Sequence, residues 1–398
     1  MAANLSASFV RSMCIGEIEE EILFPYPKLK EGEKEILKTI HDSVSSWLKS
    51  KQGEFRKWDK KGELPKEIIE EMKQMGLFGV IIPEEFGGMG LSTIAYQRLI
   101  SELAQYDGSL LITMAAHSSI GMKGLLLFGT KEQKQKYLPK LATGEMIAAY
   151  CLTEAGAGSD AASIKTKAVR DGDDWILNGE KIWITNGGIA DFFTVFAATD
   201  TPEGKITGFI VTRDMNGVTS GPHEDKMGLR ASSTTTVNFE NVRVPKENVL
   251  GEVGKGFKTA VRILNHGRTG GLGGGCVGVM KKCIALSTKQ AKIRKQFGKS
   301  ISEFGLIKKK IGQMVVDCYA TESVVTIVSS LIDAGYEDYA VEAAISKIFA
   351  SEALWRATDE ALQIAGGNGF MAEYPYEQLM RDARVNRIFE GTNEVLSL

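Results

Sequence analysis

The stretch DWILNGEKIWIT, Asp174–Thr185, decides the fold class because it interrupts a chain whose other segments follow helical patterns. Apolar and polar residues alternate on both sides of Asn178-Gly179, a pair that tolerates positive φ and is typical of tight hairpin turns. We therefore predict two strands that turn at this pair. Further β-branched and aromatic runs follow it, namely FFTVFAAT, TGFIVTR and STTTVNFENVRVP. Together these segments predict a β domain over residues 147–252.

The segments on both sides are predicted to be helical. TKEQ, Thr130–Gln133, has the pattern of a capping box that opens a helix. After Leu250–Phe257 the helical periodicity returns, and GGNGF, Gly366–Phe370, is predicted to break it. The sequence thus predicts an α+β protein with helical domains over residues 1–146 and 253–398. One face of the first long helix is expected to carry Ile36, Leu37, Ile40, Val44, Trp47 and Leu48.

Composition excludes several classes of function. The net charge of −2 and the lack of a basic stripe with aromatic residues argue against nucleic-acid binding. Five scattered cysteines predict no disulfide framework, and four distant histidines show no metal-ligand spacing. His117 and Lys123 interrupt the apolar stretch 109–129, which favours a buried core helix, and we expect no membrane span.

Two nucleotide-binding patterns are rejected. GGGCVG, Gly273–Gly278, satisfies G-x-G-x-x-G, but no predicted strand precedes it and no acidic residue follows at about 20 positions. We interpret it as a helix whose small residues let a neighbouring helix approach closely. FGKS, Phe297–Ser300, ends like a phosphate-binding loop, but Ile293 stands where the first glycine is required.

Two motifs are candidates for binding a planar cofactor. YCLTEAGAGSD, Tyr150–Asp160, has small residues that free backbone N–H groups to face a flavin edge or a phosphate. The alternative is an ordinary β-turn, in which Glu154 and Asp160 are turn-fixing side chains rather than catalytic acids. In KIWITNGG, Trp183 could cover a planar ring while Thr185 bonds to its edge. The alternative for Trp183 is a core aromatic.

These motifs make the chain similar to the acyl-CoA dehydrogenase family. CLTEAGAGSDAAS (residues 151–163) resembles one family signature at every constrained position. QIAGGNGFMAEYPYEQLMRD (residues 363–382) resembles a second, except that Gln378 replaces the usual Lys or Arg, which we expect to be a surface change. FPYP (residues 24–27) and LNHGRTG are similar to the very-long-chain branch. The resemblance implies an N-terminal helical domain, a middle β-barrel-like domain and a C-terminal four-helix bundle.

The resemblance also implies FAD as the cofactor and a homo-oligomer, either a dimer or a tetramer. The positions that match flavin contacts are Tyr150, Leu152, Thr153, Ser159, Trp183 and Thr185. Those that match contacts to the adenosine end of FAD in a neighbouring subunit are Arg294, Gln296, Phe297, Gln363, Gly366 and Gly367. Thr392 and Glu394 match contacts at the C-terminal end.

Glu390 is the predicted catalytic base. A carboxylate against Phe389 is desolvated, which should raise its pKa toward that of an activated thioester α-proton. The resemblance gives Glu390 this role, with its N–H helping to polarise the thioester carbonyl. The alternative is a solvated carboxylate at a helix start. Some relatives carry the base just before an arginine that matches Arg268, where Gly267 cannot serve. The substrate contacts implied are Ser159, Asn265, Arg268 and Gly391.

The expected reaction is dehydrogenation of a long-chain acyl-CoA to trans-2-enoyl-CoA in fatty-acid β-oxidation. The resemblance implies electron-transferring flavoprotein as the acceptor. Small Ala115 and Ala116 in the helix expected to line the acyl site predict a deep tunnel and a long chain. An acyl-CoA oxidase that uses O2 and a respiratory complex I assembly factor that retains the fold remain alternatives.

Two expectations concern the context of the chain. TNEVLSL, Thr392–Leu398, is too short for a stable helix by itself. We therefore expect that the final helix continues, and that a further helical domain follows, in a longer protein. The expected location is the cytoplasm for a bacterial protein and the mitochondrial matrix for a processed eukaryotic one.

Overall fold

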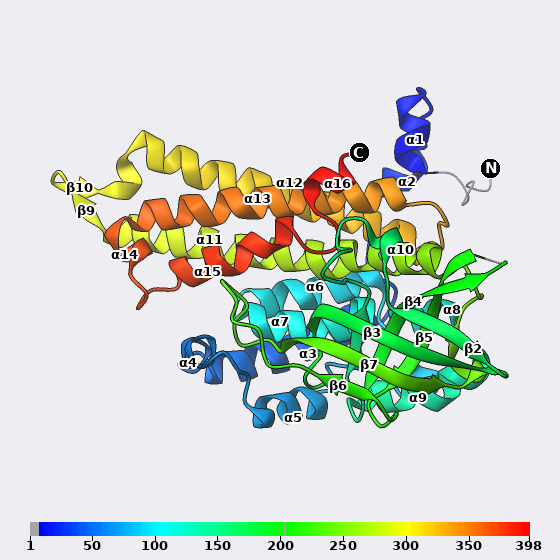
Figure 1. Cartoon of the computed structure of the whole chain (residues 1–398). Coiled ribbons are helices and arrows are strands. Elements are labelled where there is room, and N and C mark those ends of the chain that lie inside the picture. The colour runs from blue at the N-terminus through cyan, green and yellow to red at the C-terminus, as the bar shows by residue number, and fades with distance from the viewer. Residues whose placement is uncertain (1–7, 203) are drawn as a thin grey trace.

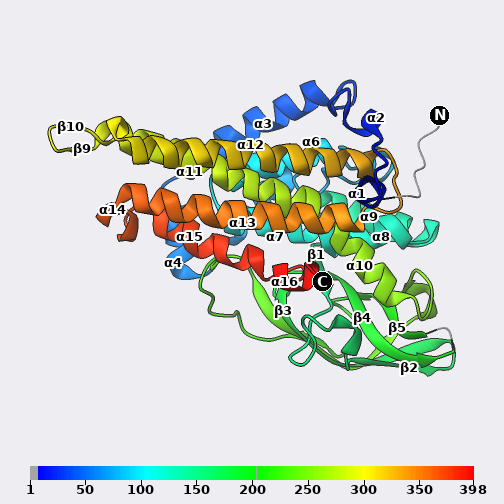
Figure 2. The ribbon, with the colours of Figure 1, turned by 90° about the horizontal axis from the view of Figure 1, so that it is seen from above.

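The order of helical, β and helical parts predicted from the sequence is confirmed. The computed structural model describes residues 8–202 and 204–398. A long helical bundle lies along one side of the molecule with the short helices of residues 9–14 and 20–23 beside it, and the later N-terminal helices and the β sheet share the other side (Figure 1). Seen from above, the bundle helices run nearly parallel to one another (Figure 2). The predicted divisions after residues 146 and 252 remain predictions.

The N-terminal part is a cluster of helices around its own apolar core. The predicted apolar face of α3 is largely correct, since Leu37, Val44 and Leu48 are buried, although Ile36 is exposed. The predicted capping box is confirmed at Thr130 and Gln133. The helices are α1 Phe9–Cys14, α2 Glu20–Leu23, α3 Glu33–Ser50, α4 Phe55–Lys61, α5 Lys66–Gln74, α6 Thr93–Ala104, α7 Gly108–Ala115, α8 Lys123–Phe128 and α9 Lys131–Thr143.

The middle part is one twisted sheet. Its hydrogen-bonded order is β6-β7-β3-β2-β4-β5-β8, and β1 pairs with β4 in parallel. Its inward-facing residues, such as Phe193, Val195 and Phe209, form a second core. The strands are β1 Ala148–Cys151, β2 Lys167–Asp171, β3 Asp174–Thr185, β4 Phe192–Thr201, β5 Gly204–Thr212, β6 Val218–Ser220, β7 Thr234–Val244 and β8 Val249–Leu250.

The predicted hairpin turn at Asn178-Gly179 is wrong. β3 continues through this pair, and its pairing with β7 shifts register there. The register shift is a β-bulge, in which the Asn178 side chain accepts the Asn241 N–H and Gly179 has a φ of 149°. A Cβ at Gly179 would lie 2.5 Å from Thr166 Oγ1, so glycine permits this approach. The tight turn lies earlier, at Gly172 between β2 and β3.

The C-terminal part is the helical bundle. α11, α12, α13 and α15 form most of it, and a two-stranded hairpin caps one end (Figures 1 and 2). The elements are α10 Gly256–His266, α11 Gly274–Ile293, β9 Lys295–Gln296, β10 Lys299–Ser300, α12 Gly305–Asp333, α13 Ala340–Ala365, α14 Gly367–Phe370, α15 Tyr376–Arg384 and α16 Asn393–Leu396. The predicted break at GGNGF is confirmed at Gly366, whose φ is 62°.

The small residues of GGGCVG lie inside a helix, as predicted. A Cβ at Gly274 would lie 2.7 Å from the Gln97 carbonyl oxygen, and one at Gly278 only 2.1 Å from that of Ser101. Helices α6 and α11 therefore touch backbone to backbone. This contact joins the N-terminal helices to the bundle.

Two helices contain a π-helical turn at the same level. Ala116–Gly121 joins α7 to α8, and Gly267–Gly273 joins α10 to α11. A Cβ at Gly271 would lie 3.0 Å from Ser119 Oγ, so the two turns are in contact. π-turns are frequent at functional sites because each one changes the direction in which the following side chains point.

Two described helical segments, Gly108–Phe128 and Gly305–Asp333, are long and apolar enough to cross a membrane by composition. In its most apolar window, the first is 67% buried within the protein, in agreement with the predicted core helix, and the second is 39% buried. All five cysteines lie in the described part of the chain and are free thiols, as predicted.

Candidate active site

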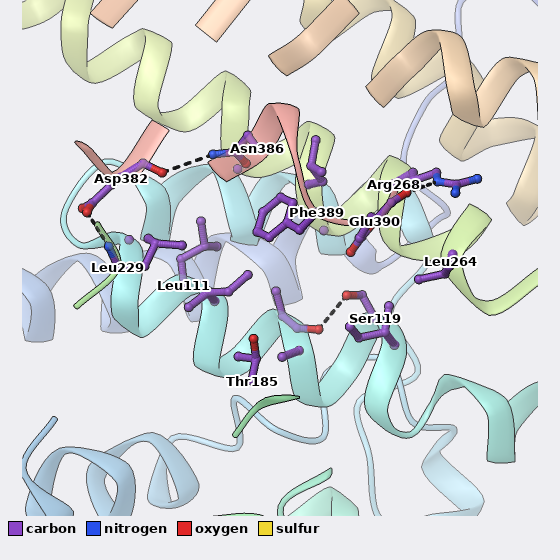
Figure 3. Close-up of a pocket in the computed structure, with 18 of the residues that line it drawn as sticks. Leu111, Ser119, Thr185, Leu229, Leu264, Arg268, Asp382, Asn386, Phe389 and Glu390 are labelled. Atoms are coloured by element: carbon purple, nitrogen blue, oxygen red, sulfur yellow. Dashed lines mark hydrogen bonds between the residues drawn. The ribbon is translucent and has the colours of Figure 1, made fainter. Parts of the chain in front are cut away.

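A cavity of about 390 Å³ lies where the three parts of the chain meet. Its walls come from α7 and the following π-turn, from α10 and α11, and from α15 and the segment after it. Loops of the β sheet close the remaining side. Figure 3 shows Glu390 and Arg268 at one end of the cavity and Asp382 and Leu229 at the other.

Helices α7 and α11 form the two long walls of the cavity, and residues of one helix contact residues of the other along its length. A Cβ at Gly271 would meet Ser119, whereas one at Gly275 would lie 3.0 Å from Leu111 Cδ2. Farther along, Lys282 Nζ lies 5.7 Å from the centre of the Tyr106 ring. Residue numbers therefore rise along α11 as they fall along α7. The cavity runs lengthwise between two antiparallel helices, and the glycines on α11 leave its middle open.

Glu390 projects a carboxylate into this cavity. Its Oε2 is buried and has no hydrogen-bond partner in the described part of the chain. Burial raises the pKa of Glu390 to about 7, although the positive charges of Arg268 and Lys347 oppose the shift. A carboxyl group with this pKa can take up and release a proton near neutral pH. The alternative of a freely solvated carboxylate does not fit this environment.

The backbone at Glu390 is held in an unusual conformation. Glu390 has a φ of 56° and Gly391 one of 93°, and positive φ is strained for a glutamate. Arg268 Nε donates to the Glu390 carbonyl oxygen at 2.9 Å. Lys347 Nζ donates to the Gly391 carbonyl oxygen at 2.8 Å. Two buried cations thus fix the turn that aims the carboxylate.

Each of these cations is itself anchored. Arg268 is buried, and its Nη1 donates to Asn265 Oδ1 at 2.7 Å. Lys347 is fully buried on α13, and its Nζ also donates to Asn393 Oδ1 at 2.7 Å. Burial lowers the pKa of Lys347 to about 8. Lys347 was missed in the sequence because it lies 43 positions from Glu390 in an ordinary helical pattern.

Gly267 lies against the carboxylate. A Cβ at this position would be 3.0 Å from Glu390 Oε1 and 3.1 Å from Oε2. The π-turn thus presents a position without a side chain to Glu390. A carboxylate at residue 267 would occupy the same space as the one at residue 390, so the chain has room for one base here.

The opposite wall offers a surface for a flat ligand. Tyr150, Leu152, Thr153, Ser159, Trp183 and Thr185, all predicted flavin contacts, line the same cavity. Trp183 is 64% exposed, which rules out the core-aromatic alternative. In the loop before it, nothing in the described part of the chain lies within 4 Å of a Cβ built at Gly156 or Gly158. The loop is therefore open on the side where a planar group would be held.

Glu154 and Asp160 fix the turn, as predicted. Glu154 accepts the N–H groups of Lys165 and Thr166 and pairs with buried Lys181 at 2.7 Å. Asp160 accepts the Ser163 hydroxyl. Neither carboxylate lines the cavity.

Other predicted site residues lie outside the cavity. Arg294, Gln296, Phe297, Gln363, Gly366 and Gly367 belong to the hairpin β9–β10 and the adjoining ends of α11 and α13, at one end of the bundle (Figures 1 and 2). Thr392 caps α16, Glu394 is exposed, and Asn265 contacts Arg268 behind the wall. Gly391 does line the cavity. The cofactor roles of these residues remain predictions.

Sequence reasoning missed the far end of the cavity. The residues there are Leu229, Lys282, Gln378 and Asp382. Gln378 is only partly exposed and lines the cavity, so its expected place on the open surface is wrong. The signal that could have found it was the spacing of Gln378, Asp382 and Asn386, four residues apart, on the helical face that leads to Glu390.

Profiles of one protein family match the three parts of the chain in order. Residues 33–145 match the acyl-CoA dehydrogenase N-terminal domain, residues 149–242 the middle domain and residues 254–398 the C-terminal domain. The chain is 49% identical over 407 residues to the very long-chain specific acyl-CoA dehydrogenase, mitochondrial, of Bos taurus. The match covers all of this chain but only 62% of the length of the bovine protein.

Solved structures agree with the sequence comparison. Butyryl-CoA dehydrogenase from Megasphaera elsdenii is 38% identical with a TM-score of 0.88, over 93% of this chain and 97% of that one. An acyl-CoA dehydrogenase from Bacillus anthracis, solved in complex with FAD, is 40% identical with a TM-score of 0.84. That match covers 97% of this chain and 69% of the other.

Proposed function

The chain belongs to the acyl-CoA dehydrogenase family, and from this membership and the cavity geometry we propose that it dehydrogenates acyl-CoA thioesters with FAD. The product is a trans-2-enoyl-CoA. The observation that carries the proposal is the carboxyl group of Glu390, which lines the cavity and whose Oε2 is shielded from water and has no partner among the described residues.

The residues around the cavity fit FAD. The exposed indole of Trp183 offers a face for a flat ring, and the open loop at Gly156 and Gly158 leaves backbone N–H groups free for its polar edge. Thr153, Ser159 and Thr185 add hydroxyl groups on the same wall. When bound there, FAD supplies the acceptor for the hydride that leaves the substrate β-carbon.

The chain itself supplies the base and its alignment. Glu390 takes the proton from the substrate α-carbon, and its raised pKa brings it closer to the pKa of that acid. Arg268 and Lys347 hold the strained turn so that the carboxylate stays aimed. The Glu390 N–H has no acceptor in the described part of the chain, so it is free to polarise the thioester carbonyl.

A long acyl chain is the substrate that the cavity supports best. Gly108 and Ile120 both line the cavity and lie twelve positions apart on one continuous helical segment. Twelve residue steps at about 1.5 Å each give roughly 18 Å. An extended chain covers about 3.6 Å per three bonds, so this space suits on the order of fifteen bonds. Ala115 and Ala116 line the middle and leave it unobstructed.

The end of the bundle supports a homo-oligomer. Phe297 is 93% exposed and Phe370 82% exposed, and both lie at the end that carries the predicted adenosine contacts. Exposed aromatic side chains of this kind are typical of association surfaces. We propose that a second subunit covers them and that each subunit completes the FAD site of the other.

Replacement of the base tests the reaction. We expect Glu390→Gln to keep a yellow, FAD-loaded protein but to lose flavin bleaching by acyl-CoA, with kcat reduced about 10²–10⁴-fold. Glu373→Gln is the control, because Glu373 is exposed in the loop before α15. Turnover by Glu390→Gln comparable to that of the control would refute the assignment.

The electron acceptor requires its own assay. We propose that electron-transferring flavoprotein receives the electrons, and the competing acceptor is O2. Under air, an oxidase releases peroxide in step with enoyl-CoA formation. A dehydrogenase turns over with electron-transferring flavoprotein and releases little peroxide. Stoichiometric peroxide would replace the proposal with an acyl-CoA oxidase.

A further inference from the structure

A side chain from a loop of the β domain lines the far part of the cavity. Leu229 lies in the loop between β6 and β7, and it lines the cavity next to Asp382 and Gly108 (Figure 3). The other end is marked by Ile120, which lies beside Gly267 and Glu390. Leu229 is thus separated from the base by the part of the cavity that runs from Ile120 to Gly108, and Tyr106, Lys282 and Gln378 line it beyond that point.

Leu229 enters the cavity because its helical neighbour lacks a side chain. A Cβ at Gly108 would lie 2.7 Å from Leu229 Cδ2 and 3.2 Å from Asp382 Oδ2. The first distance is too short for two carbon atoms, so any larger residue at position 108 would displace the leucine. Glycine at the start of α7 therefore makes room for this particular side chain.

The backbone of Leu229 is held against its preference. Its φ is 51°, which is strained for a bulky residue. The carboxylate of Asp382 accepts the Leu229 N–H at 2.6 Å. The Leu229 carbonyl oxygen accepts the Ser232 hydroxyl at 2.8 Å. Both backbone polar groups of Leu229 are therefore hydrogen-bonded, which holds its backbone in place with the side chain lining the cavity.

The loop around Leu229 is held against helix α15 of the bundle by a close backbone contact and a hydrogen bond. A Cβ at Gly228 would lie 2.4 Å from the carbonyl group of Arg381, so the loop lies directly on α15. Arg381 Nη1 donates to the Met227 carbonyl oxygen at 3.0 Å. Arg230 Nη1 donates to that of Lys226 at 2.8 Å. These contacts come from the bundle and from the loop itself, and none of them needs a ligand.

We propose that Leu229 is a specificity-determining residue that narrows the acyl cavity near its far end and sets the longest chain it accepts. The proposal rests on the proposed function, because it assigns the length limit of the same site. The terminal methyl of the longest accepted chain meets the Leu229 side chain. Packing of Leu229 that has no effect on chain length is the competing interpretation.

Two substitutions of opposite size test the proposal. Leu229→Ala lengthens the cavity, and Leu229→Trp shortens it. Met227→Ala is the matched control, because Met227 lies in the same loop with its side chain 59% exposed. Each holoenzyme is assayed for kcat/KM with octanoyl-, palmitoyl- and arachidoyl-CoA. Dissociation constants for the matching S-alkyl-CoA thioethers, which cannot be oxidised, are measured by calorimetry.

The expected changes depend on chain length. Leu229→Trp should lower kcat/KM and affinity at least about tenfold for palmitoyl- and arachidoyl-CoA, and far less for octanoyl-CoA. Each methylene that loses its place is worth about fourfold, which corresponds to about 0.8 kcal/mol. Leu229→Ala should raise kcat/KM for arachidoyl-CoA several-fold. Met227→Ala should leave kcat/KM for all three substrates within about twofold of the wild-type values.

The outcomes separate the two levels of the argument. Wild-type protein that oxidises acyl-CoA while both Leu229 variants keep its length profile would overturn this inference alone. Wild-type protein that neither binds nor oxidises an acyl-CoA of any length would overturn the proposed function, and this inference with it. Equal losses at every chain length with a lowered thermal midpoint would mean a structural role, and would also overturn the inference.

Discussion

The carboxyl group of Glu390 has a pKa set by two opposing effects of its surroundings. Burial raises the pKa, and the charges of Arg268 and Lys347 lower it, with burial the larger effect. The carboxylate is therefore the reactive form, but at neutral pH only part of the empty enzyme carries it. Substrate binding and catalysis should both respond to this balance.

The first prediction is a pH dependence of turnover. Only ionised Glu390 can act as a base, so kcat/KM should fall about tenfold per pH unit below about pH 7 and level off above it. Stopped-flow measurement of flavin bleaching from pH 5 to pH 9 would record this limb. A profile that stays flat down to pH 5 would contradict the raised pKa.

The second prediction concerns stability. Because the folded pKa of Glu390 lies above its ordinary value of 4.5, ionisation opposes folding as pH rises through this interval to about 7. Glu390→Gln cannot ionise, so its thermal midpoint relative to wild type should rise between pH 4 and pH 8. Scanning calorimetry of the FAD-loaded proteins measures this difference. A difference that is the same at both pH values would refute the argument.

The third prediction concerns Lys347. Its charge lowers the pKa of Glu390, so Lys347→Met should move the acid limb of the kcat/KM profile to higher pH. The variant also leaves the Gly391 carbonyl without its donor, at about 1–3 kcal/mol, and removes one of the two donors to Asn393 Oδ1. Lys347→Arg keeps the positive charge, so it should move the acid limb part of the way back to its wild-type pH. A loss of stability with an unchanged limb would mean that Lys347 is structural only.

The residues that a short motif singled out lie together in the structure, although their roles remain predictions. Glu390, Arg268 and the predicted flavin contacts lie in segments with distinctive local patterns, and all of them line one cavity. Leu229 and Lys347 have no such pattern. Their places depend on which loop and which helix pack beside the motif, and these are long-range contacts that a single sequence does not display.

At the scale of elements, the packing of α6 on α11 depends on glycine. The fourth prediction is that Gly278→Ala lowers the free energy of unfolding by about 1–3 kcal/mol, because its Cβ would press on the Ser101 carbonyl oxygen. Lys289→Ala, on an exposed position of α11, should change stability by less than about 0.5 kcal/mol. Equal midpoints for both variants would show that the helices can separate freely.

The misplaced hairpin has a physical explanation at this scale. Asn-Gly is typical of hairpin turns, but here the pair lies opposite a β-bulge whose extra residue is on β7, between Phe239 and Val242. What selects the bulge here is β7, which pairs with β3 on both sides of Gly179. The partner strand begins 55 positions later, at Thr234, so the local pattern alone could not distinguish the two structures.

For the molecule as a whole, the order of parts followed from changes in hydrophobic period, because each period is local. The way in which the parts meet around the cavity did not.

The fifth prediction concerns assembly at the exposed end of the bundle. Light scattering should give a mass that is a multiple of 43.4 kDa. Phe297→Ser combined with Phe370→Ser should weaken association and lower FAD content.

A matched control uses Ile36→Ser, which alters an exposed apolar residue on α3. This variant should associate and hold FAD as the wild type does. A wild-type protein that is monomeric at every concentration while it retains FAD would contradict the shared site.

The shape of the cavity depends on the number of residues in the two π-helical turns. Each turn adds about one residue to a helix, and one residue changes the facing direction by about 100°. A single deletion within residues 269–273 would therefore rotate α11 out of phase, so that Val279 and Lys282 turn away from the cavity while Arg268 stays in place. In-frame indels in this short glycine tract should therefore disrupt the wall of the cavity before they unfold the bundle, which makes the tract intolerant of length variation.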